Sequence, residues 1–171
     1  GDECYVVGLR GHIVELDYPP EFNDWSKVDP IDLVKASPAK RVTALNILHT
    51  LSELAAECDE VIIATDYDRE GELIGLETVT LLERPPRSVR RARFSALTKY
   101  EIERAFKELT DPDHRLAESA ETRQIIDLAW GAALTRFLSL ASGQMGNNFL
   151  SVGRVQSPTL TLIVDRHREI T

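Results

Sequence analysis

The sequence has 171 residues, of which 43% are hydrophobic and 28% charged, with 9 Gly and 8 Pro. This composition is typical of a folded globular chain long enough to bury a core, and it excludes a disordered tail, a fibre and a disulfide-stapled miniprotein. The formal net charge of −8, taken as an average, argues against a nucleic-acid partner, because phosphate binding depends on Lys and Arg.

The charge is unevenly distributed along the chain. Residues 1–83 contain 6 Lys and Arg against 18 Asp and Glu, a net of −12, and residues 84–171 contain 14 against 10, a net of +4. An acidic half joined to a basic half is expected where carboxylates bind a metal and arginines bind phosphate. The alternative is that the charges are unevenly distributed by chance.

The two cysteines, Cys4 and Cys58, are far apart and lie in neither a CxxC motif nor a His-rich segment. They predict two ordinary thiols, which suit a reducing cytoplasm, rather than a zinc site or a redox pair. The longest apolar run is far shorter than a membrane span. We therefore expect a cytoplasmic protein with no membrane partner.

The first part of the sequence alternates between strand and helix patterns. Apolar residues recur at helical spacing over 40–58, whereas 60–64 is a short, nearly continuous apolar run typical of a strand buried in a parallel sheet. Thr98 and Glu101 form a capping-box pattern that opens a helix. In chain order we predict β-rich runs at 5–9 and 12–16, mostly loop at 17–38, a helix at 40–58, a strand at 60–64, a helix at 70–83, a strand at 89–94 and a helix from 98 to about 109.

The sequence changes character after residue 110. Residues 116–141 form a long, Ala-rich helical pattern, 144–148 a polar loop, and 151–170 a second helix in which Pro158 is tolerable only in the first turn. We predict an α/β domain over 1–110 with a parallel sheet, followed by a mainly helical segment over 111–171.

An acidic loop follows the predicted strand 60–64. Asp66, Asp68, Glu70 and Glu72 lie within seven residues, at the edge of the sheet where α/β folds place their ligands. Four carboxylates this close repel one another unless a cation neutralises them, and hard oxygen ligands favour Mg²⁺ or Mn²⁺. The pattern therefore predicts a Mg²⁺ site that would position and neutralise a phosphate.

The loop also allows three other interpretations. The first is a solvated helix start, where the helix dipole favours carboxylates. The spacing also nearly fits a calcium-binding EF-hand loop, but that loop is entered from a helix and not from a β-branched strand. A phosphatase with a nucleophilic aspartate is disfavoured by Glu70, where that motif requires a small residue.

Two motifs give the sequence a family resemblance. Residues 64–72, Ala-Thr-Asp-Tyr-Asp-Arg-Glu-Gly-Glu, resemble the DxDxxGE signature of the Toprim domain, which topoisomerases, primases and some nucleases share. Residues 151–160, Ser-Val-Gly-Arg-Val-Gln-Ser-Pro-Thr-Leu, closely resemble the GRVQ-S/T-P signature of type IA DNA topoisomerases. Segments 8–13, 93–98 and 120–131 resemble further family segments in the expected order. In detail, the amino-acid sequence of these segments is most similar to that of archaeal topoisomerase I/III-like enzymes.

The resemblance implies a Toprim fold over 1–110 that lacks its first strand, and the start of a helical, domain IV-like DNA-binding segment over 111–171. The family cleaves one DNA strand by attack of a tyrosine, passes a strand through the gap and reseals it. The acidic positions associated with catalytic Mg²⁺ are matched by Asp66, Asp68 and Glu70. The residues expected to bind DNA are Arg69, Arg123, Asp127, Arg154 and Gln156. The implied partners are single-stranded or locally melted DNA near the nucleoid and the remaining domains of a parent topoisomerase.

The sequence departs from a complete enzyme at two points. The family places its nucleophilic tyrosine in a Tyr-x-Arg-Ser/Thr-Asp context, and none of Tyr5, Tyr18, Tyr67 and Tyr100 has such neighbours. The glutamate of the family's first Toprim strand has no counterpart upstream either. We therefore expect an internal part of a type IA topoisomerase that does not cleave DNA alone. The alternatives are a stand-alone Toprim-like nucleic-acid-binding module and a metal-dependent nuclease or phosphatase.

Some residues carry weaker expectations. Arg123 and Asp127, four apart on a helix, form either an intrahelical ion pair or part of the DNA groove. The arginines at 84, 87, 90, 91 and 93 are as compatible with a solvated loop and edge strand as with a DNA contact. Trp130 is at helical spacing with Ile126 and Leu134, which favours a core position over a base-stacking platform.

Overall fold

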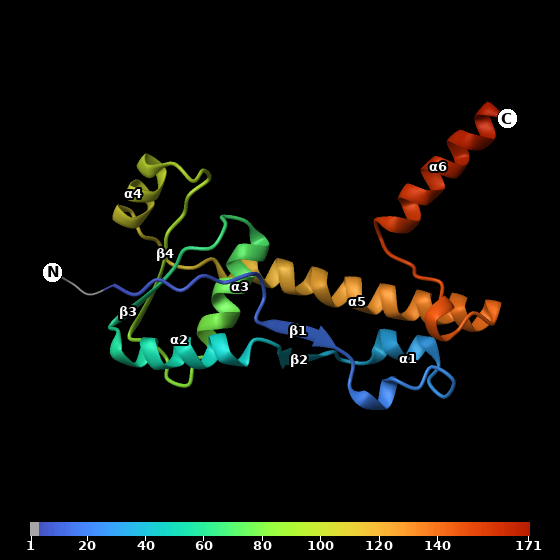
Figure 1. The fold of residues 1–171 in the computed structure, drawn as a ribbon, viewed down its shortest axis with the longest axis horizontal. Coiled ribbons are helices and arrows are strands. Elements are labelled where there is room, and N and C mark those ends of the chain that lie inside the picture. Colours follow the sequence, from blue (N-terminus) through green and yellow to red (C-terminus); the bar gives the residue numbers. More distant parts are fainter. Residues whose placement is uncertain (1–3) are drawn as a thin grey trace. The chain divides into compact units, whose positions relative to one another are not determined.

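The computed structural model describes residues 4–171, and its elements alternate between strand and helix up to residue 107 and are helical thereafter (Figure 1). In chain order they are β1 (Val14–Asp17), the 3₁₀ turn η1 (Pro20–Phe22), α1 (Pro30–Lys35), β2 (Ala39–Val42), α2 (Leu45–Glu57), β3 (Glu60–Ile63), α3 (Arg69–Thr80), β4 (Ser88–Arg91), α4 (Lys99–Lys107), α5 (His114–Ser142), the 3₁₀ turn η2 (Gly146–Asn148) and α6 (Gln156–Ile170). The predicted α/β part followed by a helical part is confirmed.

The described strands form two sheets of two strands each, β1 with β2 and β3 with β4. β3 and β4 are parallel, with Glu60 opposite Ser88 and Ile63 opposite Arg91, as the alternation of strand and helix predicts. Only Ile63 of β3 is buried, however, so the strand is less enclosed than its apolar sequence suggests.

The chain folds into two compact units, which are described separately. Unit 1 contains the residues up to Glu15 together with Arg41–Thr122, and unit 2 contains Leu16–Lys40 and Arg123–Thr171. The segment 16–40 thus belongs with the helical residues from 123 onward. The domain boundary expected at residue 110 remains a prediction about the family's domains.

Each unit has its own small core. In unit 1, Leu73 of α3 packs with Ala117 and Ala120 from the first turns of α5. The core of unit 2 contains Tyr18, Leu33 of α1 and Ala133 of α5. Burial raises the pKa of the Tyr18 phenol, against the opposing effect of Arg136, and the hydroxyl donates to the Leu33 carbonyl at 2.7 Å.

Several predicted boundaries are wrong, and each has a physical cause. Residues 5–9 form no strand, because no described strand pairs with them, and Val6 is 92% exposed. The helix predicted from residue 40 begins at Leu45, since 39–42 pair with β1. α6 begins at Gln156 and not at residue 151, because residues 151–153 are irregular and 154–155 form a turn.

The segment 17–38, expected to be mostly loop, contains the short helix α1. Asp29 caps this helix by accepting from the backbone N–H of Ile31 at 3.0 Å, and Pro30 occupies its first position. An Asp-Pro pair is a recognised helix start, so the sequence does carry a local signal for α1.

Helix α5 has 29 residues and is, by length and composition alone, apolar enough to cross a membrane. A mostly buried core helix passes the same test, but the apolar window of α5 is 17% buried among the described residues. Asp127 and Arg136 of α5 are engaged with Arg154 and with the Phe22 carbonyl, respectively. Charged groups satisfied in this way are what a helix packed against protein requires, so α5 gives no independent support for a membrane partner.

Candidate metal loop and nucleic-acid interface

The acidic loop joins β3 to α3 in unit 1. Asp68 is the N-cap of α3, and its Oδ1 accepts from the backbone N–H of Gly71 at 2.7 Å. The Thr65 hydroxyl donates to the Gly71 carbonyl at 2.6 Å. These two bonds close the loop over the first turn of the helix, so the predicted turn into a helix after the strand is confirmed.

Only glycine fits at position 71, because there is no room for a side chain. A Cβ at this position would lie 2.1 Å from the Asp66 carbonyl oxygen and 2.9 Å from the Asp66 carbonyl carbon. Any side chain would therefore push the start of α3 away from the loop. The close approach places the backbone of Asp66 directly against the helix.

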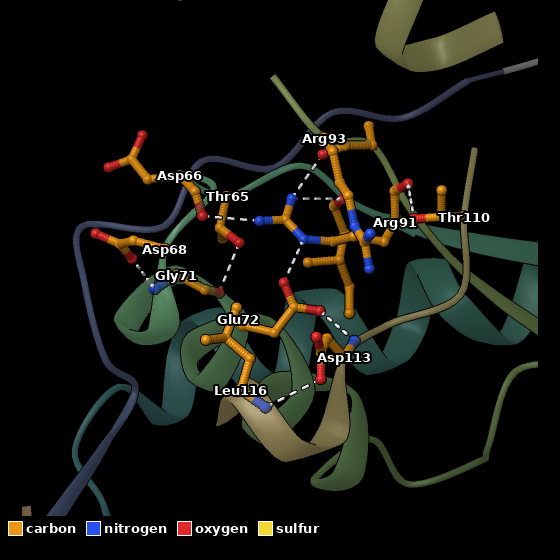
Figure 2. Close-up of polar contacts among 12 residues, drawn as sticks. Thr65, Asp66, Asp68, Gly71, Glu72, Arg91, Arg93, Thr110, Asp113 and Leu116 are labelled. Atoms are coloured by element: carbon orange, nitrogen blue, oxygen red, sulfur yellow. Dashed lines mark hydrogen bonds and ion pairs between the residues drawn. The ribbon is translucent and has the colours of Figure 1, made fainter. Parts of the chain in front are cut away.

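The three predicted metal ligands lie along the loop without converging. The Asp66 side chain is exposed and points away from the buried contacts, and Asp68 uses one carboxylate oxygen as a cap (Figure 2). Glu70 lies beside His12, with 3.5 Å between Oε2 and Nε2. Among residues 4–171, no three His, Cys, Asp or Glu side chains gather as a metal cage.

The donor chemistry of the loop nevertheless fits a hard cation. Mg²⁺ keeps several of its waters and is commonly held by one or two carboxylates together with substrate phosphates, so it does not need a cage built only from protein. Asp66 makes no side-chain hydrogen bond or ion pair with the described residues, and Asp68 retains its second oxygen. Asp66, Asp68 and Glu70 are the groups of this loop that would hold the ion.

Glu72, the fourth carboxylate of the motif, has a different role. It is fully buried and forms an ion pair with the equally buried Arg91, with 2.8 Å between Oε2 and Nε. Its other oxygen, Oε1, accepts from the backbone N–H of Asp113 at 2.6 Å. The negative charge of Glu72 is thus neutralised by protein, and the argument that all four carboxylates need a cation is wrong for this one.

Arg91 bonds to the backbone on both sides of the loop (Figure 2). Its Nη2 donates to the Asp66 carbonyl at 2.7 Å, and its Nη1 donates to the carbonyls of Ile63 and Ala92 at 3.2 and 2.7 Å. Arg91 is therefore neither a solvated arginine nor a DNA contact, which were the two expectations for its cluster. The sequence offers no signal that separates it from the other arginines of the cluster, of which Arg84 and Arg87 are exposed and Arg90 and Arg93 half-buried.

Asp113 links this network to helix α5. Its Oδ1 accepts from the backbone N–H of Leu116 at 3.0 Å, a bond typical of the residue just before a helix. Because Glu72 holds the N–H of the same residue, the start of α5 is fixed to the helix that carries the acidic loop.

His12 supports α3 from a second side. Its Nδ1 lies 3.2 Å from Oε2 of Glu77, which is 8% exposed, while its Nε2 faces Glu70. In the sequence, His12 lies in the segment 8–13 that resembles a family motif and Glu77 lies in the predicted helix 70–83, and neither pattern indicates a contact between them. Only the fold brings these residues together, since 65 positions separate them.

A second group of predicted residues meets in unit 2. Arg123 and Asp127 lie one turn apart on α5, with 3.6 Å between Nε and Oδ2, so the predicted intrahelical pair is present. Arg154, from the turn just before α6, places its Nε 2.5 Å from Oδ1 of the same Asp127. One carboxylate therefore holds two arginines from segments about 30 residues apart in sequence.

The segment that carries Arg154 is anchored to α5 through its backbone. The Val152 N–H donates to the Thr135 hydroxyl at 3.0 Å, and the Leu150 N–H donates to the Ser139 hydroxyl at 2.9 Å. Gln156 begins α6 and shares a 3.4 Å hydrogen bond with Ser151. Arg69, the remaining predicted DNA contact, is exposed at the first position of α3 in unit 1.

The prediction for Trp130 is wrong. Its side chain is 55% exposed and Ile126 is 57% exposed, so this face of α5 is not in the core of the described structure. The apolar periodicity of α5 is real, but its buried stripe is the one that carries Ala133.

Comparisons with known proteins agree with both motifs. A family model described as the Toprim domain matches residues 1–97, and one described as DNA topoisomerase matches residues 111–171. DNA topoisomerase 1 of Archaeoglobus fulgidus is 52% identical over 171 residues, and DNA topoisomerase 1 of Thermoplasma acidophilum is 47% identical over 170 residues.

These matches cover nearly all of this chain but only part of each relative. The two relatives cover 99% of this chain, which spans 26% and 22% of their respective lengths. The solved structure of full-length topoisomerase I from Thermotoga maritima matches with a TM-score of 0.67 and 31% identity, over 94% of this chain and 26% of that one. The Toprim match covers more than half of the chain's residues and the helical part matches the DNA topoisomerase model, so the chain belongs to the type IA DNA topoisomerase family, which combines the two.

Proposed function

We propose that this chain supplies the metal loop and part of the single-stranded DNA groove of a type IA DNA topoisomerase that changes DNA topology by transient cleavage of one strand. The observation that carries the proposal is the pairing of the two motifs in one chain. The acidic loop capped by Asp68 belongs to unit 1, and the Arg123–Asp127–Arg154 cluster belongs to unit 2.

In this proposal, Asp66, Asp68 and Glu70 hold Mg²⁺, which neutralises and positions a DNA phosphate when it is bound. Arg123 and Arg154 bind backbone phosphates, Gln156 bonds a phosphate or a base edge, and Asp127 orients the two arginines. Arg69, exposed next to the loop, adds a further phosphate contact. We place the protein in an archaeal-type enzyme, in the cell interior with the DNA, because of the relatives it resembles.

The direct test is binding of a fluorescent single-stranded oligonucleotide at several salt concentrations. Arg154→Ala should weaken binding and lower the salt dependence, since one phosphate contact contributes about 0.7 to the slope of log K against log salt for single strands. Arg168→Ala is the matched control, because Arg168 is an exposed arginine of α6 outside the motif, paired with Asp165 in its own helix. Equal effects of the two substitutions would contradict the assignment of Arg154.

A metal-dependent nuclease is the second candidate, favoured by the acidic loop alone. It predicts Mg²⁺-dependent degradation of single-stranded DNA by this chain, abolished by Asp68→Ala. The topoisomerase proposal predicts intact DNA in the same assay, so a gel separates the two.

A further inference from the structure

We propose that Arg91 and Glu72 are positioning residues for the acidic loop, and that they set the affinity of the metal site without touching the ion. The inference rests on the metal binding proposed above. It concerns two residues that the predicted site does not include, both fully buried.

The contacts of Arg91 are concentrated on the segment that delivers the ligands. Three of its four hydrogen bonds go to backbone carbonyls, those of Ile63, Ala92 and Asp66, and the fourth goes to Glu72. Ile63 ends β3 and Asp66 is the first acidic residue of the loop. One guanidinium therefore fixes the chain at both ends of the turn from the strand to the first ligand.

Stability alone does not account for this arrangement. A buried ion pair is often no more stabilising than apolar side chains of the same volume, because desolvation offsets the attraction. What apolar residues cannot do is hold the Asp66 carbonyl in place. The planar fork of Arg91, itself oriented by Glu72, reaches that carbonyl while keeping its other bonds.

The orientation of the Asp66 carboxylate follows from its backbone. Asp66 has no side-chain partner among the described residues, so nothing but the path of its backbone directs its carboxylate. Groups behind a metal's ligands that orient them typically contribute about 10- to 100-fold to metal affinity. Loss of the bond to Asp66 should have an effect of this size.

The experiment measures binding of Mn²⁺, as a probe for Mg²⁺, to the 171-residue chain by the electron paramagnetic resonance of the free ion, together with urea unfolding. Arg91→Met with Glu72→Gln removes both buried charges at once and leaves an amide oxygen for the Asp113 N–H. We expect this double variant to fold and to bind Mn²⁺ about 10- to 100-fold more weakly. Native-like stability with unchanged Mn²⁺ affinity would overturn the inference.

Two further variants keep the test decisive. If the double variant does not fold, Arg91→Lys takes its place under the same criterion, because Lys can pair with Glu72 but has no second arm for the Asp66 carbonyl. Asp68→Asn keeps the cap of α3 and removes one ligand charge. Mn²⁺ binding that Asp68→Asn leaves unchanged, or no binding by the wild type, overturns the metal proposal and this inference together. Binding lost in Asp68→Asn but kept in the Arg91 variants overturns this inference alone.

Discussion

The size of a side chain in the acidic loop matters as well as its charge. Gly71 has no room for a Cβ because the Asp66 carbonyl occupies that position. We expect Gly71→Ala to destabilise the chain by about 1–3 kcal/mol, since the obstacle is backbone and not a flexible side chain. Urea unfolding measures this change, with Gly8→Ala as the control, because a Cβ at Gly8 meets nothing within 4 Å. Equal unfolding midpoints for the two variants would contradict the steric argument.

The limits of sequence reasoning are clearest for residues that look alike in the sequence. Arg90, Arg91 and Arg93 are neighbours, yet only Arg91 is fully buried and paired with Glu72. A strand directs successive side chains to opposite faces. Which face is covered depends on the packing of α3 and α5, and the residues around β4 carry no signal for that packing. Asp66 and Asp68 could be located from the sequence, because their motif is contiguous and follows a recognisable strand.

At the scale of an element, helix α3 depends on Asp68 for its first turn. This residue has two roles, since its Oδ1 caps the helix and its charge is proposed to bind metal. Without metal, Asp68→Ala should lower the free energy of unfolding by about 1 kcal/mol more than Asp68→Asn, because Asn replaces Asp as a cap and Ala does not. Urea unfolding in the presence of a chelator measures the difference. Equal stabilities would show that the cap contributes nothing.

Helices and strands were predictable where the local signal and the tertiary contacts agree. A clear hydrophobic pattern with a clear start or end is found for β3, α3, β4 and for α4 with its Thr98 cap. The segment 39–42 fits the start of a helix by periodicity, but its pairing with β1 makes it a strand. Pairing with a segment more than 20 residues away leaves no trace in a local pattern.

At the scale of the whole molecule, we expect the chain alone to leave negatively supercoiled plasmid unchanged. No tyrosine has the sequence context of the family's nucleophile, and Tyr18 is buried with its hydroxyl bonded to the Leu33 carbonyl. An agarose gel of plasmid incubated with chain and Mg²⁺ measures this. Relaxation by the chain alone would be incompatible with the proposed division of roles, and Tyr67→Phe would then test the tyrosine inside the loop.

The charge of the two spatial units differs from the charge of the two halves of the sequence. Unit 1 holds 12 Lys and Arg against 20 Asp and Glu, a net of −8, and unit 2 holds 8 against 8. The arginines at 84–93 lie in the same unit as the acidic loop. The acidic and basic halves of the sequence are therefore not the spatial units, and the expected DNA-binding unit is neutral.

If unit 2 binds DNA as proposed, it does so through arginines that are already paired with a carboxylate and not through accumulated positive charge. Asp127 already pairs with Arg123 and Arg154, so a phosphate would meet two arginines whose charge is partly offset within the protein. The cluster has a net charge of one, so the proposed binding should release fewer salt ions from the strand than two unpaired arginines would. Its salt dependence should therefore be shallow, and a strand should be taken up and released without first overcoming a large electrostatic attraction.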